Sequence, residues 1–255
     1  MKSFENICYT KMGLPEQMLD IHIPDLESFP VFIYFHGGGI EHGDKAADRN
    51  VFIEPLVNKG VAVVSANYRM YPEAVYPEFI RDAAAAVSYV MKNMKDYGNP
   101  TAFFVGGSSA GGYISQMLCF DKKYLAPYKI NPDEISGFIH DAGQPTTHFN
   151  VLRERGIDDR RIIVDEAAPL YHICSERNYA PMQIFYAEND MENRPEQTKL
   201  LVSTMKHFRC DMDKVDVRYM EGFGHCKYNK ANDEKGDNIF AKAIFEFITK
   251  YGGEN

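Results

Sequence analysis

The feature that most constrains the fold is a regular alternation of short apolar segments with segments of helical periodicity. Seven apolar or β-branched runs of strand length occur along the chain, at residues 18–23, 31–35, 61–66, 102–105, 137–140, 182–187 and 215–220. Between most of them lie segments with helical spacing, at residues 50–58, 77–94, 110–119, 195–208 and 237–251. Parallel strands need crossovers of this kind, so the alternation predicts an α/β fold with a mainly parallel central sheet flanked by helices.

The organisation of the chain predicts one domain over residues 1–255, because no repeat, low-complexity stretch or linker divides it. The first two runs, 18–23 and 31–35, have no helix between them and are expected to form an antiparallel edge. Residues 141–180 are too many for a plain connection between strands, which predicts a small insertion with residues 148–156 helical. Such an insertion could shape or cover a binding cleft near the active site.

Charge and composition exclude several classes of function. The formal net charge of -8 is spread along the chain without a long run of like charge, so nucleic acid is not expected as a partner. No segment has the roughly 18 uninterrupted apolar residues of a membrane span, and the N-terminus lacks the apolar core of a signal peptide. We therefore expect a cytoplasmic protein with no membrane partner. The five cysteines are scattered and contain no CxxC pair, which argues against a disulfide framework or a structural zinc site.

A candidate nucleophile lies where an apolar run meets a glycine-rich turn. Residues 102–105 lead directly into Gly106-Gly107-Ser108-Ser109-Ala110-Gly111-Gly112 and then into a segment that is compatible with a helix. Gly107 and Gly111, two positions either side of Ser109, leave room for a sharp strand-to-helix turn that displays a serine. No Gly-Lys-Ser/Thr sequence follows, so a phosphate-binding loop of the P-loop type is excluded.

A serine hydroxyl needs an adjacent base, and that base needs an orienting carboxylate. The run 182–187 is followed by three acidic residues, Glu188, Asp190 and Glu192, and the last run is followed by a glycine-containing loop that ends at His225. The resulting order of serine, acid and histidine is typical of hydrolases with a strand–turn–helix nucleophile. We predict Asp190 as the acid because Glu188 lies nearer the strand end and Glu192 lies further into the loop. Glu188 and Glu192 remain alternatives at this point.

Donors for a negatively charged intermediate are predicted upstream. The run 31–35 ends in His36-Gly37-Gly38-Gly39, and consecutive glycines leave backbone N–H groups free to face a ligand. The N–H groups of Gly38, Gly39 and Ala110 are predicted to form the oxyanion hole, with Ala110 at the start of a helix whose dipole favours negative charge.

No metal or cofactor is predicted. The histidines and acid that could serve as ligands are His36 with His42, or His140 with Asp141 and His148. Neither set has the compact spacing of an HExxH motif or a related metal site.

Taken together, these motifs resemble the HGGG-containing esterases and lipases of the α/β-hydrolase superfamily, the group related to hormone-sensitive lipase and the small acetyl esterases. The resemblance covers nearly the whole chain and is carried by 36–39, 67–73, 76–83, 107–112, Asp190 and His225. It implies an α/β-hydrolase fold and assigns Tyr68, Arg69 and Asp82 to the scaffold of the active site. The chain departs from the family pattern at Ser108, where many relatives have Asp or Glu, and at Ala187, where Gly is usual.

The resemblance implies a serine carboxylic ester hydrolase acting on short acyl esters, such as acetyl, small aryl or carbohydrate esters. Only about 35 residues precede His36, which leaves little chain for the N-terminal cap helices of larger members and argues against long-chain lipids. The alternatives are an arylformamidase-like or peptidase-like serine hydrolase, or a non-catalytic binding protein with the same fold. The expected partner is a small-molecule ester. An exposed edge strand or the insertion could mediate a homo-oligomer, although nothing in the sequence requires one.

Overall fold

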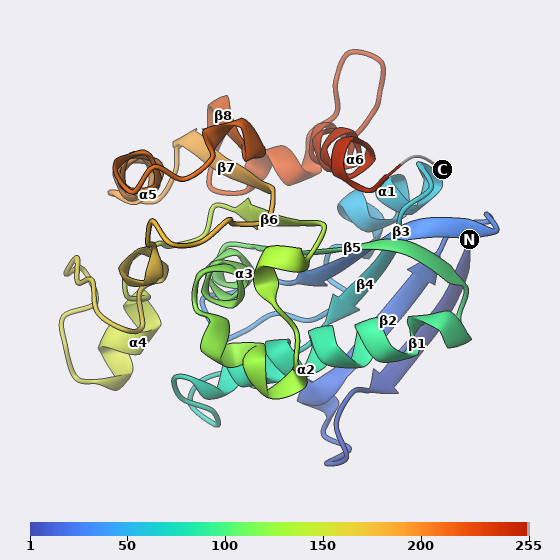
Figure 1. Cartoon of the computed structure of the whole chain (residues 1–255), viewed down its shortest axis with the longest axis horizontal. Coiled ribbons are helices and arrows are strands. Elements are labelled where there is room, and N and C mark those ends of the chain that lie inside the picture. Colours follow the sequence, from blue (N-terminus) through green and yellow to red (C-terminus); the bar gives the residue numbers. More distant parts are fainter. Residues whose placement is uncertain (254–255) are drawn as a thin grey trace.

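The computed structural model describes residues 1–253 and contains one eight-stranded mixed sheet with helices on both faces (Figure 1). The strand order is β1-β2-β4-β3-β5-β6-β7-β8. The strands are β1 (Lys2–Cys8), β2 (Met18–Ile23), β3 (Ser28–Phe35), β4 (Ala62–Ala66), β5 (Asn99–Ser108), β6 (Gly137–Asp141), β7 (Met182–Asn189) and β8 (Val215–Gly224). The α-helices are α1 (Glu54–Asn58), α2 (Glu78–Asn93), α3 (Ala110–Phe120), α4 (Phe149–Glu154), α5 (Arg194–His207) and α6 (Ile239–Tyr251). The predicted α/β fold is confirmed.

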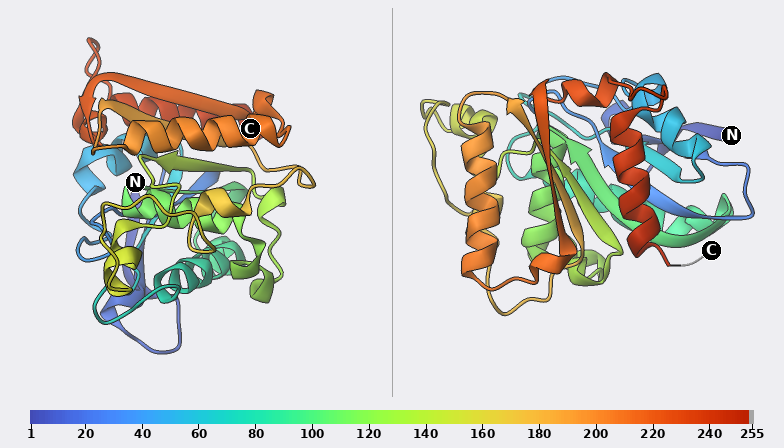
Figure 2. Two further views of the ribbon diagram at one scale, coloured as in Figure 1. Left: turned by 90° about the vertical axis from the view of Figure 1, so that its left-hand side faces the viewer. Right: turned by 90° about the horizontal axis from the view of Figure 1, so that it is seen from above.

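The two faces of the sheet are covered by different helices because the strands are apolar on both sides. In β3, Val31 and Ile33 belong to the core beneath α2 and α3, whereas Phe32 and Tyr34 belong to the core beneath α1 and α6. All four side chains are buried, and burial of each contributes about 1.5–3 kcal/mol. Figure 2 shows α5 (orange) and α6 (red) on opposite sides of the last two strands. This double burial explains why the central strands are continuous apolar runs rather than alternating ones.

The expected antiparallel pairing of the first two apolar runs is wrong. β2 pairs antiparallel with β4 and β1, and β3 pairs parallel with β4 and β5. The chain leaves β3, crosses over through α1 and returns as β4 between β2 and β3. All five residues of β4 are buried, which requires a neighbouring strand on each side.

The strand at the antiparallel edge is β1, which no apolar run predicts. Five of its seven residues are exposed, and its sequence Lys-Ser-Phe-Glu-Asn-Ile-Cys mixes charged and apolar side chains. An edge strand of this composition exposes its unpaired backbone groups next to solvated side chains, as is usual at the margin of a sheet.

The carboxyl ends of β3, β5, β6, β7 and β8 lie at the same edge of the sheet because these strands are parallel to one another. The predicted insertion is present between β6 and β7 and contains the short helix α4, whose first turn is capped by the side chain of His148. In Figure 1 this segment (yellow-green) lies beside α5, at one end of the molecule. None of the helices in the described part of the chain is long and apolar enough to cross a bilayer.

Candidate active site

Ser109 occupies the tight turn between β5 and α3. Its backbone has φ 54° and ψ -110°, a conformation that a residue with a side chain rarely adopts. The turn is held by a hydrogen bond from the Ser109 N–H to the carbonyl of Asp141, at 2.7 Å. A Cβ at Gly111 would lie 1.9 Å from the carbonyl oxygen of Phe35, so only glycine lets α3 begin this close to β3. The motif thus forms the predicted strand–turn–helix.

The structure brings the three predicted residues Ser109, His225 and Asp190 into one chain of hydrogen bonds. His225 Nε2 lies 2.7 Å from Ser109 Oγ, and His225 Nδ1 lies 2.5 Å from Asp190 Oδ1. These residues come from three separate loops, after β5, β7 and β8. A base in contact with a hydroxyl, and itself oriented by a carboxylate, is the arrangement that activates a serine nucleophile.

Asp190 is the carboxylate that reaches His225. Its side chain is fully enclosed, and it also accepts a hydrogen bond from the Met191 N–H at 2.7 Å. Burial alone would raise the pKa of Asp190, but the hydrogen bond and charge of His225, with the Met191 N–H, hold that pKa below its ordinary value. Asp190 therefore stays ionised well into the acidic range. Glu188 instead accepts a hydrogen bond from the Gly222 N–H at 2.8 Å, and Glu192 is exposed.

The glycine loop after β3 lies against the serine turn. A Cβ at Gly37 would lie 3.3 Å from Ser109 Cβ, so the two segments are in contact. Gly38 has φ +118°, and a Cβ there would lie 1.7 Å from the His42 carbonyl oxygen, which excludes any other residue. The N–H groups of Gly38 and Gly39 have no acceptor among residues 1–253, and that of Ala110 is in the first turn of α3. These groups are available to an oxyanion.

Tyr68 holds the glycine loop in place, whereas Arg69 and Asp82 bind each other. The Tyr68 hydroxyl donates to the His36 carbonyl at 2.8 Å, and its ring stacks on that of His36 at 4.6 Å. Arg69 binds Asp82 through two hydrogen bonds, of 2.8 Å and 2.9 Å.

Asp141 is a buried carboxylate below the site whose role the sequence did not reveal. It pairs in register with Ser108 on the neighbouring strand, and thus lies beside the position where many relatives carry an acid. The Tyr228 hydroxyl and the Asn229 amide donate to its two oxygens, the latter at 2.9 Å. Burial raises the pKa of Asp141, although the hydrogen bonds from Ser108, Tyr228 and Asn229 oppose that rise. Asp141 therefore links the serine turn to the segment that follows His225.

Replacing Tyr228 with Phe should lower the free energy of unfolding by about 1.5–3 kcal/mol at neutral pH, because it removes a hydrogen bond to a buried carboxylate. The phenol stabilises the ionised form, so the loss should shrink as the pH falls through the raised pKa of Asp141. Denaturant unfolding at neutral and acidic pH measures both effects. Tyr251→Phe is the control, because the Tyr251 hydroxyl makes an exposed hydrogen bond of 3.3 Å. Equal losses in the two variants would contradict the role given to Tyr228.

The candidate metal ligands in the sequence are His36 with His42, and His140 with Asp141 and His148. No group of three or more His, Cys, Asp or Glu residues among residues 1–253 could hold a metal ion. His140 is fully buried and hydrogen-bonds the Ser115 hydroxyl at 2.8 Å, and burial lowers the pKa of His140 to about 3. His148 caps α4, as described above. All five cysteines are free thiols.

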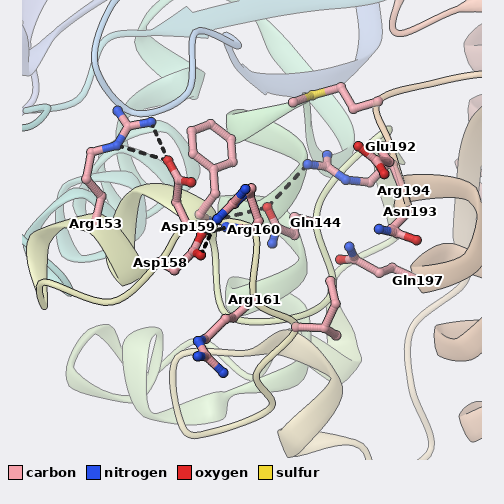
Figure 3. Close-up of a pocket in the computed structure, with 13 residues that line it drawn as sticks. Gln144, Arg153, Asp158, Asp159, Arg160, Arg161, Glu192, Asn193, Arg194 and Gln197 are labelled. Carbon is pink, nitrogen blue, oxygen red and sulfur yellow. Dashed lines mark hydrogen bonds and ion pairs between the residues drawn. The ribbon is translucent and has the colours of Figure 1, made fainter.

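The molecule has a cleft of about 750 Å³ (Figure 3). It is bounded on one side by the insertion between β6 and β7 and on the other by the start of α5, which follows the Asp190 loop. Ser109 and His225 are not among the residues that line it, whereas Phe149, which does line it, comes within 3.2 Å of a Cβ position at Gly39 in the glycine loop. The lining residues are Gln144, Phe149, Arg153, Asp158, Asp159, Arg160, Arg161, Ile162, Met191, Glu192, Asn193, Arg194 and Gln197. Most of them are charged or carry amides, so the cleft suits a polar ligand.

Part of the chain is similar in sequence to a known family and to known proteins. The family model described as BD-FAE matches residues 19–133. Esterase LipI of Mycobacterium tuberculosis is 38% identical over 96 residues, which are 37% of this chain and 30% of LipI. The chain spans about a third of the length of the first curated relatives it matches.

Solved structures resemble the chain over almost its whole length. A truncated carbohydrate esterase from gut microbiota superimposes with a TM-score of 0.78 and 20% identity, covering 100% of this chain and 97% of that one. The propionate-bound esterase Est2 of Thermogutta terrifontis superimposes with a TM-score of 0.71 and 21% identity, covering 98% of this chain and 93% of Est2. At these identities the similarity establishes the fold.

Proposed function

We propose that this chain is a member of the α/β-hydrolase superfamily and a serine carboxylesterase that hydrolyses esters of short acyl groups. The observation that carries the proposal is the hydrogen-bonded chain from Ser109 through His225 to Asp190. A fold of this kind that had become a binding protein would have no reason to keep all three groups in contact. Similarity to proteins named as esterases supports the same conclusion.

In the proposed mechanism, Ser109 Oγ attacks the ester carbonyl while His225 Nε2 takes its proton. The N–H groups of Gly38, Gly39 and Ala110 then stabilise the oxyanion of the tetrahedral intermediate. His225 passes the proton to the leaving alcohol, and Ser109 is left acylated. Water, activated by the same histidine, releases the acid and restores the serine. Asp190 keeps His225 in the correct tautomer and offsets its positive charge in both steps.

The lining of the cleft supports a short acyl group and a polar substrate. Only Phe149, Ile162 and Met191 offer a substantial apolar side chain there, so a long alkyl chain would gain little from burial. Est2 of Thermogutta terrifontis, solved with propionate bound, is an esterase of the same fold with a short-chain acid. Acetylated saccharides and small aryl esters are accordingly the substrates we propose. The cytoplasmic location and a homo-oligomer remain predictions from the sequence.

The substrate range is tested with 4-nitrophenyl esters of increasing acyl length. We expect kcat/KM to be highest for acetate to butyrate and to fall by at least about tenfold for octanoate, since extra methylenes find no apolar pocket. Release of 4-nitrophenol measures the rates, and acetylated xylose and glucose pentaacetate extend the panel to sugars. A rate that rises steadily to octanoate or palmitate would contradict the short-chain assignment.

A further inference from the structure

Arg194, the first residue of α5, is a buried cation in the wall of the cleft. Only 4% of its surface is exposed, and Figure 3 shows it across the cleft from Arg153 and Arg160. Its Nη1 donates to the carbonyl of Ala142 at 2.7 Å, and its Nη2 donates to the side-chain oxygen of Gln144 at 3.2 Å. Its Nε is buried and has no acceptor among residues 1–253. Of the five N–H donors of the guanidinium, two therefore have partners in the protein.

Neither partner of Arg194 carries a charge. No carboxylate lies within ion-pair distance of it in the described part of the chain, and the nearby acid Asp190 is hydrogen-bonded to His225. Burial lowers the pKa of the Arg194 guanidinium, although the charge of Asp190 opposes this. Removing a cation from water without a paired anion is costly. A protein that keeps such a group usually has a use for it.

A second well-buried arginine shows the arrangement that a purely structural role produces. The Arg177 side chain is 10% exposed and binds Asp133 through an ion pair of 2.5 Å. It also donates to the backbone carbonyls of Cys119 and Phe120. Arg177 thus has a dedicated counter-ion of the kind that Arg194 lacks.

Most of the other charges of the cleft are paired with one another and not with Arg194. Arg153 is paired with Glu41 and Asp159, and Arg160 is paired with Asp158. These ion pairs join two arginines to three carboxylates at the rim, and none of the three carboxylates is paired with Arg194.

Besides Arg194, two charged residues that line the cleft are outside these ion pairs. Arg161 has no carboxylate partner among residues 1–253, and Glu192 has no basic partner there. Glu192 is exposed, so solvent and salt screen its charge, whereas the charge of Arg194 is screened far less. The named charges of the cleft are four arginines and four carboxylates, so any attraction for an anion is local to the buried Arg194 guanidinium.

We infer that Arg194 binds a carboxylate of the substrate, so that the preferred esters carry a carboxylate in addition to the ester bond that is cleaved. This inference rests on the proposed esterase function. A carboxylate pairs well with a guanidinium and would accept a hydrogen bond from an N–H of Nη1 or Nη2 that has no partner in the protein. It would also supply the counter-ion that the protein does not provide.

Two pairs of esters test the inference in the intact protein. Monomethyl succinate and methyl butyrate differ by a carboxylate in place of a methyl group on the acyl side, and 3-acetoxypropanoate and propyl acetate differ in the same way on the alcohol side. The wild type should prefer the anionic member of at least one pair in kcat/KM, measured by proton release. Arg194→Gln should reduce that preference by about 10- to 100-fold, the value of a charge-assisted hydrogen bond. Arg194→Lys, which keeps the charge but not the fork, should retain part of it.

The matched control is Arg209→Gln, which removes the same charge just beyond the other end of α5, where Arg209 is exposed. It should leave the preference unchanged. The inference is overturned if the wild type prefers neither anionic ester, or if Arg194→Gln slows both members of each pair equally. In the second case Arg194 serves only to support Ala142 and Asp190. Thermal unfolding shows whether Arg194→Gln folds, and Arg194→Lys takes its place if it does not.

A binding measurement separates this inference from the proposed function. Ser109→Ala protein should bind monomethyl succinate more tightly than methyl butyrate in ligand-observed NMR titrations. Adding Arg194→Gln should weaken binding of monomethyl succinate at least about tenfold, the lower end expected for a charged hydrogen bond. If the wild type hydrolyses no ester but this binding difference is present, the proposed function fails and the carboxylate site stands. Equal binding with and without Arg194 overturns the site.

Discussion

Replacing Ser109 with Ala is expected to lower kcat for 4-nitrophenyl acetate by about 10⁵- to 10⁶-fold, the loss seen when a serine nucleophile is removed from a triad. The expected loss corresponds to about 7–8 kcal/mol of activation free energy. The reason is chemical, since alanine offers no oxygen to attack the ester and His225 then has no proton to take. The fold should survive because Ser109 Oγ contacts only His225 in the hydrogen-bond network of residues 1–253.

The neighbouring serine is a suitable control. Ser108 is buried and accepts a hydrogen bond from the Asn229 amide at 3.3 Å, but it does not contact His225. Ser108→Ala should stay within about tenfold of the wild type, because it removes the hydrogen bonds of Ser108 to Asn229 and Asp141 but leaves the contact between Ser109 and His225 in place. Steady-state rates compare the activities of the two variants, and circular dichroism shows whether both are folded. Full turnover by Ser109→Ala would remove the serine from the mechanism.

Replacing Asp190 with Asn is expected to lower kcat by about 10⁴-fold while leaving the packing of the loop nearly unchanged. An amide in place of the carboxylate can stabilise the wrong tautomer of His225, with the proton on Nε2 instead of Nδ1, and it cannot offset the charge of the imidazolium. The hydrogen bond of 2.5 Å between His225 Nδ1 and Asp190 is the contact on which this prediction depends.

The two alternative acids provide matched controls for Asp190. Glu188→Gln and Glu192→Gln each remove one carboxylate two positions from Asp190, but neither carboxylate contacts His225 among residues 1–253. Both variants should retain turnover close to that of the wild type. A large loss in Glu188→Gln or Glu192→Gln, together with an active Asp190→Asn, would transfer the role of the acid to another residue.

The fold was predictable where burial on both sides of the sheet leaves an unbroken apolar run. The β3 and β4 segments are such runs, and helical periodicity identified α2, α3, α5 and α6 between the strands. Neighbour relations were less predictable, because an apolar run records burial and not the identity of the adjacent strand. The position of β4 between β2 and β3 therefore depends on tertiary packing, which the apolar pattern does not record. The exposed edge strand β1 lacks the apolar pattern that would have identified it.

The candidate site was predictable where a residue follows a strand in a recognisable motif. Ser109, Asp190 and His225 are of this kind, and the structure brings their side chains into contact. Asp141 and Arg194 were not predictable as members of the site. Asp141 is identified as a buried carboxylate that accepts hydrogen bonds from Tyr228 and Asn229, and Arg194 as a buried guanidinium without a counter-ion. Neither arrangement leaves a pattern in the sequence.

The central claim is that Ser109 is the nucleophile, and covalent labelling tests it most directly. A fluorophosphonate should add one adduct per chain, abolish ester hydrolysis and map by peptide mass spectrometry to Ser109, because only the serine next to His225 is activated. Ser109→Ala should take up no label, and treatment with a chelator should leave activity intact. An adduct on another residue, or undiminished hydrolysis by fully labelled protein, would contradict the account.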